Sequence, residues 1–225
     1  MELFWKYLGD LLNVVGFFGL IITILNWFYT HKIKFYVVIN KLFSINKTVR
    51  FDLVILSTNK SNKINEILEN FRLKTSHSLK MISKSKNKID FSYEDLRVSI
   101  EYNSRSFDEF DTIVSIESPK ATYNESLKRI KSIGKIISLL EKEELLTNVN
   151  FQFKTYFNKN NPFVGQTLSN VKIGEIKRFM MILSFSDEGK FSDIDNDIQI
   201  NLNEISYVDN EYVNIVEVAD FVLAL

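Results

Sequence analysis

The sequence predicts an α+β fold in which one N-terminal transmembrane helix precedes a cytosolic domain with an antiparallel or mixed β-sheet and one long helix. Three observations predict this fold. An uncharged apolar stretch lies near the N-terminus, period-two alternation recurs after it, and one long segment has a strong helical repeat. We therefore divide the 225 residues into a transmembrane anchor over residues 1–31 and a cytosolic α+β domain over residues 32–225.

The predicted anchor spans Leu11–Tyr29, a stretch without formal charge that is followed by His31 and Lys32. About 20 apolar residues cross the hydrocarbon core of a bilayer, and tryptophans such as Trp5 and Trp27 are typical of its two interfaces. A signal peptide and a buried core helix are the alternatives. Basic residues outnumber acidic ones after the stretch, so we expect the chain in the inner (plasma) membrane, with its N-terminus outside and its C-terminal domain in the cytoplasm.

One face of this predicted helix carries small and polar residues. At 100° per residue they fall within a stripe of ~80°. Small residues let helix backbones approach, and Thr and Asn can hydrogen-bond between helices. We therefore expect a homo-oligomer that associates through this stripe; a water-facing pore lining and an incidental arrangement are the alternatives. The stripe consists of Gly16, Gly19, Thr23 and Asn26, and the opposite side consists of Phe17, Phe18, Ile21, Ile24, Leu25 and Phe28.

Alternating apolar and polar residues predict most of the strands of the sheet. Two further segments are apolar almost throughout, which is typical of central strands. The alternating segments are Ile33–Asn40, Val49–Ile55, Leu96–Asn103, Val149–Phe157 and Ile198–Asn203, and the apolar ones are Ile113–Ile116 and Phe179–Phe185.

The long helix is predicted over Tyr123–Leu146. Thr122 and Glu125 form a T-x-x-E capping box at its start, and apolar residues recur along it at helical spacing. The helix links two predicted strands and completes a β-α-β unit. Shorter helices are predicted at Asn62–Glu69 and Asn210–Leu223, whereas the Ser- and Lys-rich segment Thr75–Asp90 is predicted to be an exposed loop.

Basic residues gather in the first half of this long helix, and acidic residues gather near its end. Helix dipoles favour the opposite arrangement, so the basic cluster at the positive end could hold an anion such as a nucleotide phosphate. The alternative is a solvated helix face with i, i+4 contacts. The candidate ligand-binding residues are Lys128, Arg129, Lys131 and Lys135.

The sequence offers no catalytic motif, no metal site and no cofactor site. It has no Cys, and its glycines are too far apart for a phosphate-binding loop. The Asp193-Ile-Asp195-Asn-Asp197 segment resembles a calcium loop but has Ile198 where the turn needs Gly. His31 and His77 have no convincing partners in sequence. We therefore expect no enzyme, no cofactor and no bound metal ion.

The formal net charge of zero argues against a nucleic-acid partner. It hides an asymmetry, because basic residues are in excess over the first 100 residues and acidic residues are in excess over the rest. A basic segment next to a membrane is attracted to anionic lipids. The predicted partners are therefore the lipid bilayer, further copies of the chain, and either a nucleotide ligand or a cytosolic protein.

In architecture the chain resembles the small membrane effectors of bacterial anti-phage signalling, which use cyclic nucleotides. The resemblance depends on the Leu11–Tyr29 anchor, its Gly/Thr/Asn stripe and the following domain, and no family motif accompanies it. It implies a membrane-anchored sensor that receives a nucleotide signal, clusters and alters membrane integrity in anti-phage defence. The alternative is a membrane-tethered scaffold or accessory subunit that binds a protein partner without ligand or catalysis.

Overall fold

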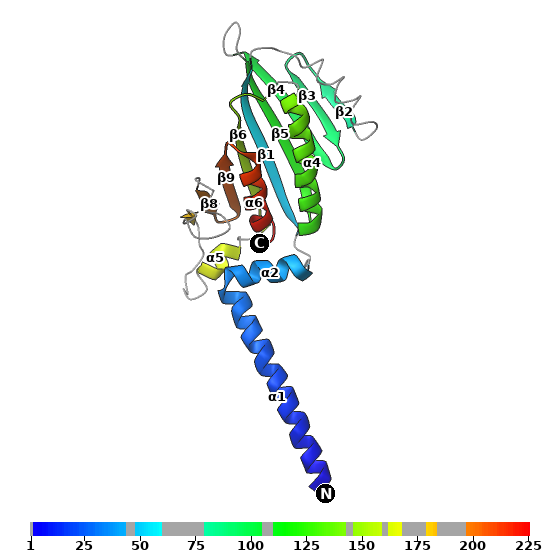
Figure 1. Ribbon diagram of the computed structural model, residues 1–225, viewed down its shortest axis with the longest axis vertical. Helices are drawn as coiled ribbons and strands as arrows, with labels where there is room; N and C mark the ends of the chain where they lie inside the picture. Colours follow the sequence, from blue (N-terminus) through cyan, green and yellow to red (C-terminus); the bar gives the residue numbers. More distant parts are fainter. Residues whose placement is uncertain are drawn as a thin grey trace.

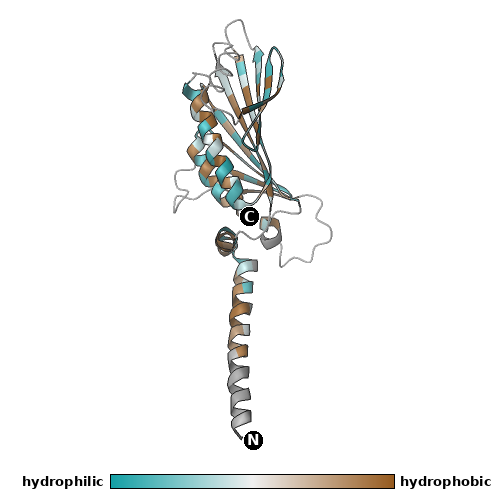
Figure 2. Ribbon diagram, turned by 90° about the vertical axis from the view of Figure 1, so that its right-hand side faces the viewer, coloured by the Kyte–Doolittle hydropathy of each residue, from teal (hydrophilic) through white to brown (hydrophobic). Residues whose placement is uncertain are grey.

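A nine-stranded antiparallel sheet forms the centre of the molecule, and helices cover one of its faces (Figures 1 and 2). This computed structural model describes residues 2–43, 48–59, 79–104, 110–142, 146–158, 162–167, 179–183 and 197–225, with side chains of the first helix described from residue 15 onwards. The described helices are α1 (Glu2–His31), α2 (Ile33–Phe43), α4 (Tyr123–Lys142), α5 (Pro162–Thr167) and α6 (Tyr212–Val222).

The strands follow one another mostly as a meander. They are β1 (Val49–Asn59), β2 (Leu79–Lys84), β3 (Lys88–Tyr93), β4 (Leu96–Ser104), β5 (Phe110–Ala121), β6 (Asn150–Tyr156), β7 (Met180–Leu183), β8 (Ile198–Asn201) and β9 (Glu204–Asp209). Their order in the sheet is β2-β3-β4-β5-β1-β6-β9-β8-β7. β1 is central and pairs antiparallel with both β5 and β6, so α4 crosses over β1 to connect these two strands. The predicted β-α-β unit is therefore present.

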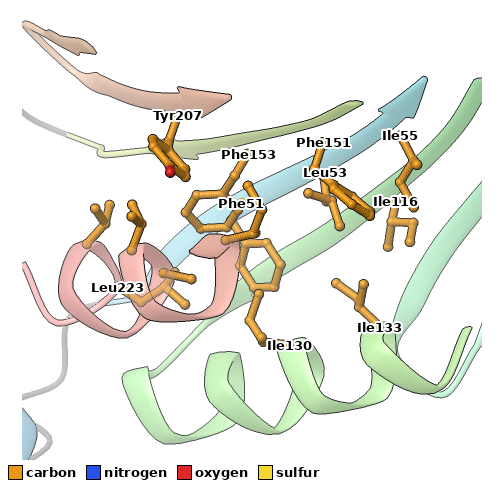
Figure 3. Packing of buried hydrophobic residues seen from close by; sticks show 14 of the residues in the cluster. Phe51, Leu53, Ile55, Ile116, Ile130, Ile133, Phe151, Phe153, Tyr207 and Leu223 are labelled. Atoms are coloured by element: carbon orange, nitrogen blue, oxygen red, sulfur yellow. The ribbon is translucent and has the colours of Figure 1, made fainter. Parts of the chain in front are cut away.

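The hydrophobic core lies between the sheet and the pair α4 and α6 (Figure 3). Because side chains alternate along a strand, every second residue of each central strand points into this layer. In β1 these residues are Phe51, Leu53 and Ile55, and all three are fully buried. From the helices, Ile130 and Ile133 of α4 and Ile215 and Val218 of α6 meet them.

The opposite face of the sheet carries polar and charged residues. In β6 the exposed-face positions alternate strictly with the buried ones, and the same pattern runs through β3, β4 and β9. An antiparallel sheet with one covered face is expected to show this alternation. The prediction of an α+β class with an antiparallel sheet thus agrees with the structure. The combination of one transmembrane helix with one long helix does not, because five helices are described and none of them is apolar enough to cross a membrane.

The prediction of a transmembrane anchor is wrong for the described residues. In that part of the chain, none of the helices combines the length and the apolar character needed to cross a membrane. The polar residues Thr23 and Asn26 lie within α1. The predicted location in the inner membrane loses its basis with the anchor.

Three other predictions also need correction. Ile33–Asn40 is not a strand but belongs to α2, and the expected loop Thr75–Asp90 contains β2 and the start of β3. Phe179–Phe185 contains β7, which lies at an edge of the sheet and not in its centre. The helix expected at Asn62–Glu69 lies outside the described residues.

The buried hydroxyl of Ser126 gives a stability prediction. Ser126 lies on the covered side of α4, is fully buried, and its Oγ has no hydrogen-bond partner within the described structure. An unsatisfied buried hydroxyl is costly, and Ala is the better helix former, so Ser126→Ala is expected to raise the free energy of unfolding by about 1 kcal/mol. Urea unfolding measures this change. The exposed Ser138→Ala on the same helix is the control, with a change below about 0.5 kcal/mol; a loss of stability in Ser126→Ala would contradict the prediction.

Candidate functional site

The outer face of α4 carries a row of lysines. At 100° per residue, Lys128, Lys131, Lys135 and Lys142 fall within ~60° of one another on the helix. All four are exposed, and the buried side of α4 lies opposite, against the sheet. The row continues for about 21 Å along the helix axis at ~1.5 Å per residue.

Within the described part of the chain, the lysines of this row form no ion pair, although Lys128 lies one turn from Glu125, whose pKa is lowered by hydrogen bonds from Thr122 and also by Lys128. Among the described residues, ion pairs join Lys41 to Asp220 and Arg129 to Asp95, but none includes a lysine of the row. Like charges at i and i+4, such as Lys131 and Lys135, destabilise a helix by a few tenths of a kcal/mol. The row is therefore a concentration of positive charge that an anion would relieve.

Arg129 takes a different position from its three predicted companions. Its Nη1 donates to the carbonyl oxygen of Pro119 at 2.7 Å and to the Ser118 hydroxyl at 3.2 Å, and its Nη2 lies 3.7 Å from an Asp95 carboxylate oxygen. The side chain is only 14% exposed. Arg129 thus ties the start of α4 to the end of β5 and to the β3–β4 turn, while Lys128, Lys131 and Lys135 face outwards.

A shallow groove of about 680 Å³ runs along the lysine row. Three residues of the row's face, Lys131, Lys135 and Lys142, line it together with the Ser138 hydroxyl. The remaining lining residues are Tyr93, Gly134, Leu139 and Tyr212. Lysine ammonium groups and a hydroxyl donate hydrogen bonds to anionic oxygens, so the lining suits a negatively charged ligand.

Tyr212, the first residue of α6, fixes one border of the groove. Its hydroxyl donates to the carbonyl oxygen of Ile130 at 2.6 Å, and burial raises its pKa above the ordinary value. Its ring packs so close to Gly134 that a Cβ there would lie 3.3 Å from a ring carbon. A side chain at position 134 would press on this ring, so Gly134 favours the close approach of α6 to α4.

The predicted stripe on α1 lies on a helix that projects away from the sheet (Figure 1). Gly16 and Gly19 have open space around them, and the Thr23 hydroxyl donates to the carbonyl oxygen of Gly19 at 2.8 Å. The structure brings these residues onto one face of the helix, as expected for Gly16, Gly19, Thr23 and Asn26. It places them far from the lysine row.

A polar joint connects α1 and α2 to the helices of the sheet domain. The Tyr29 hydroxyl donates to the Asn40 side-chain oxygen at 3.2 Å, and the Asn40 amide donates to the carbonyl oxygen of Ala224 at 2.9 Å. The next residue of α2, Lys41, forms an ion pair with Asp220 of α6. Asp220 also accepts a hydrogen bond of 2.6 Å from the hydroxyl of Tyr123 in α4. Burial, with Asp220 beside it, raises the pKa of Tyr123.

A second, smaller pocket lies on the uncovered face of the sheet. It has a volume of about 220 Å³ and is lined by charged residues and serines of β3, β4 and β5. These charges have partners within the sheet: Lys88 lies 4.0 Å from Glu101, and a hydrogen bond of 2.7 Å from Ser83 lowers the pKa of Asp90. The three lysines that line the groove have no such ion-pair partner among the described residues, so the lysine row is the stronger candidate.

The other candidates from the sequence lead to no chemical site in the described structure. His31 stacks on Trp27, with ring centroids 5.1 Å apart. His77, Asp193 and Asp195 lie outside the described residues. Among the described residues, His, Cys, Asp and Glu form no group of three that could hold a metal ion.

Sequence reasoning missed the part of the groove that tertiary contacts create. Lys142 continues the row at helical spacing and could have been found by extending the same arithmetic. Tyr93 and Tyr212 come from β3 and α6, and no local pattern marks them as neighbours of α4. Comparison of the chain with protein-family models and with curated protein sequences finds no match.

Proposed function

We propose that this chain is a self-associating receptor that binds a phosphate-bearing anion, of the nucleotide class, on the outer face of α4. The observation that carries the proposal is the row of four exposed lysines, none of which forms an ion pair among the described residues. Three of these lysines line one groove, which is large enough for a ligand of nucleotide size. Phosphate oxygens are strong acceptors for lysine ammonium groups.

Self-association is the second part of the proposal, and the surface of α1 supports it. Large apolar side chains are exposed along one face of this helix, including Phe17, Phe18, Ile24 and Leu25. Contiguous apolar surface of this kind marks an interaction site. The joint at Asn40 and Asp220 gives α1 and α2 a fixed attachment to α4 and α6. Ligand binding and assembly would therefore take place on connected helices.

Isothermal titration calorimetry tests the ligand site with two probes, ATP and inorganic tripolyphosphate. Both probes carry the same triphosphate charge pattern, so their comparison separates phosphate recognition from recognition of the nucleoside. We expect both to bind the wild-type chain, ATP more tightly, with affinity that falls as salt rises. Lys131→Ala/Lys135→Ala is expected to weaken binding at least ~10-fold, since each lost charged hydrogen bond removes about 1.5 kcal/mol or more.

The matched control is Lys88→Ala/Lys154→Ala, which removes the same charge from the opposite face of the sheet. It should leave the affinity unchanged within about twofold. If neither probe binds the wild-type chain, or if both double variants lose affinity equally, the lysine row is not the ligand site and this part of the proposal fails.

A further inference from the structure

The helix α1 offers two different faces to a partner. One carries the small residues Gly16 and Gly19, and the opposite one carries large apolar side chains. Five side chains of the large face are exposed by 39–63%: Phe17, Phe18, Ile24, Leu25 and Phe28. The two faces cannot both be the centre of one interface, because they lie about 180° apart on the helix.

The exposed apolar area on the large face is sufficient for a stable contact. A large apolar side chain has roughly 150–250 Å² of surface, so five that are about half exposed offer on the order of 500 Å². Two copies that cover this face on each other would bury about 1,000 Å² in total, the lower bound for a specific interface. The glycines contribute almost no apolar area, and only two large exposed side chains, Leu20 and Trp27, lie close beside them. A contact centred on Gly16 and Gly19 would leave the larger apolar face uncovered.

The spacing on the large face fits a helix–helix seam between identical chains. Phe17, Ile21, Ile24 and Phe28 follow one another at intervals of four, three and four residues. This is the alternation of a and d positions in a coiled coil, in which the same pattern on both partners interlocks. The seam has no formal charge between Asp10 and His31, so two copies meet without like-charge repulsion.

The small face has less to gain from a partner. The hydroxyl of Thr23 already donates to the carbonyl oxygen of Gly19 within the same helix. The space around Gly16 and Gly19 is open, so these two residues border no cavity that a side chain of the partner could fill. The hydrophobic effect favours contacts in proportion to the apolar area removed from water, which selects the opposite face.

From these observations we infer that a second copy of this chain docks on the large apolar face of α1, along the seam Phe17–Ile21–Ile24–Phe28, and not on the small-residue stripe. The inference rests on the self-association part of the proposed function and names its contact surface. It is independent of the ligand site on α4.

Sedimentation velocity of the full-length chain over a range of concentrations tests the inference. Ile24→Asn, on the seam, is expected to raise the dimer dissociation constant roughly 100-fold or more, because each dimer loses two buried isoleucines. Ile22→Asn is the matched control, since Ile22 is 64% exposed but lies outside the seam. It should change the constant less than about threefold. Gly19→Leu, on the small face, should also leave association intact.

The possible results separate the claim about the contact surface from the claim that the chain self-associates. If Gly19→Leu dissociates the chain and Ile24→Asn does not, the small face is the interface and the inference is overturned, while self-association stands. Equal dissociation by Ile24→Asn and Ile22→Asn overturns it as well. A wild-type chain that is monomeric at all concentrations overturns both the inference and the self-association part of the proposed function. Unfolding of the sheet domain, followed by circular dichroism, should be the same in all variants, because α1 projects away from it.

Discussion

Replacing Asp209 with Ala is expected to lower the free energy of unfolding by about 3–5 kcal/mol. Asp209 ends β9 and is 4% exposed. Its carboxyl group accepts hydrogen bonds from the backbone N–H of Glu211 at 2.8 Å, from the Asn214 amide at 3.2 Å and from the hydroxyl of Tyr207. Removing a buried acceptor leaves its donors unsatisfied, and each loss costs about 1–3 kcal/mol.

The position of Asp209 makes the effect specific to α6. The residue holds the first turn of this helix, where Tyr212 borders the lysine groove. Equilibrium urea unfolding measures the change. Glu211→Ala is the control, because Glu211 is exposed and its side chain makes no capping hydrogen bond; it should cost less than about 0.5 kcal/mol. Similar values for the two variants would show that Asp209 does not hold the helix.

The strands that could be predicted are those with one buried face. β1, β4, β6 and β8 alternate because the helices cover one side of the sheet and the other side stays polar. β2 lies at an edge with almost all its residues exposed, so its sequence carries no alternation and indicates a loop. β7 is apolar although it is an edge strand, so its sequence alone indicates a central strand.

The segment from Ile33 shows why a short pattern can fit two structures. Ile33, Phe35 and Val37 alternate with Lys34 and Tyr36 as in a strand. The residues that the fold buries are Tyr36, Val37 and Asn40, the i, i+1, i+4 spacing of a helix, and their partners are at the other end of the chain. Contacts between residues so far apart in the sequence decide between the strand and the helix, and a pattern of neighbouring residues does not reveal such contacts.

The candidate site was predicted in part for the same reason. α4 was predictable from its capping box, which the structure contains as hydrogen bonds of 2.9 Å from Thr122 to Glu125, and it presents Lys131 and Lys135 on its outer face. Arg129 lies about 160° from Lys131 on the same helix, so helical arithmetic alone could have separated it from the ligand-binding group. The groove also needs α6, whose packing on α4 no sequence pattern indicates.

Truncation of Phe153 to Ala has the other large expected effect, a loss of about 3–5 kcal/mol in the free energy of unfolding. Phe153 is fully buried in β6, with its ring 5.8 Å from that of Phe51 (Figure 3). Phe153 pairs with Leu53 of β1 on one side and with Tyr207 of β9 on the other. The strands that support α6 would therefore all border the cavity that the truncation leaves. The loss has two parts, the transfer free energy of the removed ring and the cost of the cavity. The cavity remains because a sheet can collapse only partly around it.

The neighbouring residue supplies the control that tests the layer architecture. Gln152 precedes Phe153 and lies on the uncovered face of the same strand, so Gln152→Ala should cost less than about 1 kcal/mol. Urea unfolding with an unchanged m value would show that the difference comes from native packing and not from the unfolded state. Equal losses at the two positions would mean that both faces of β6 are covered. The uncovered polar face would then be an interface, and α4 and α6 would no longer be the only layer on which a ligand or a partner copy could act.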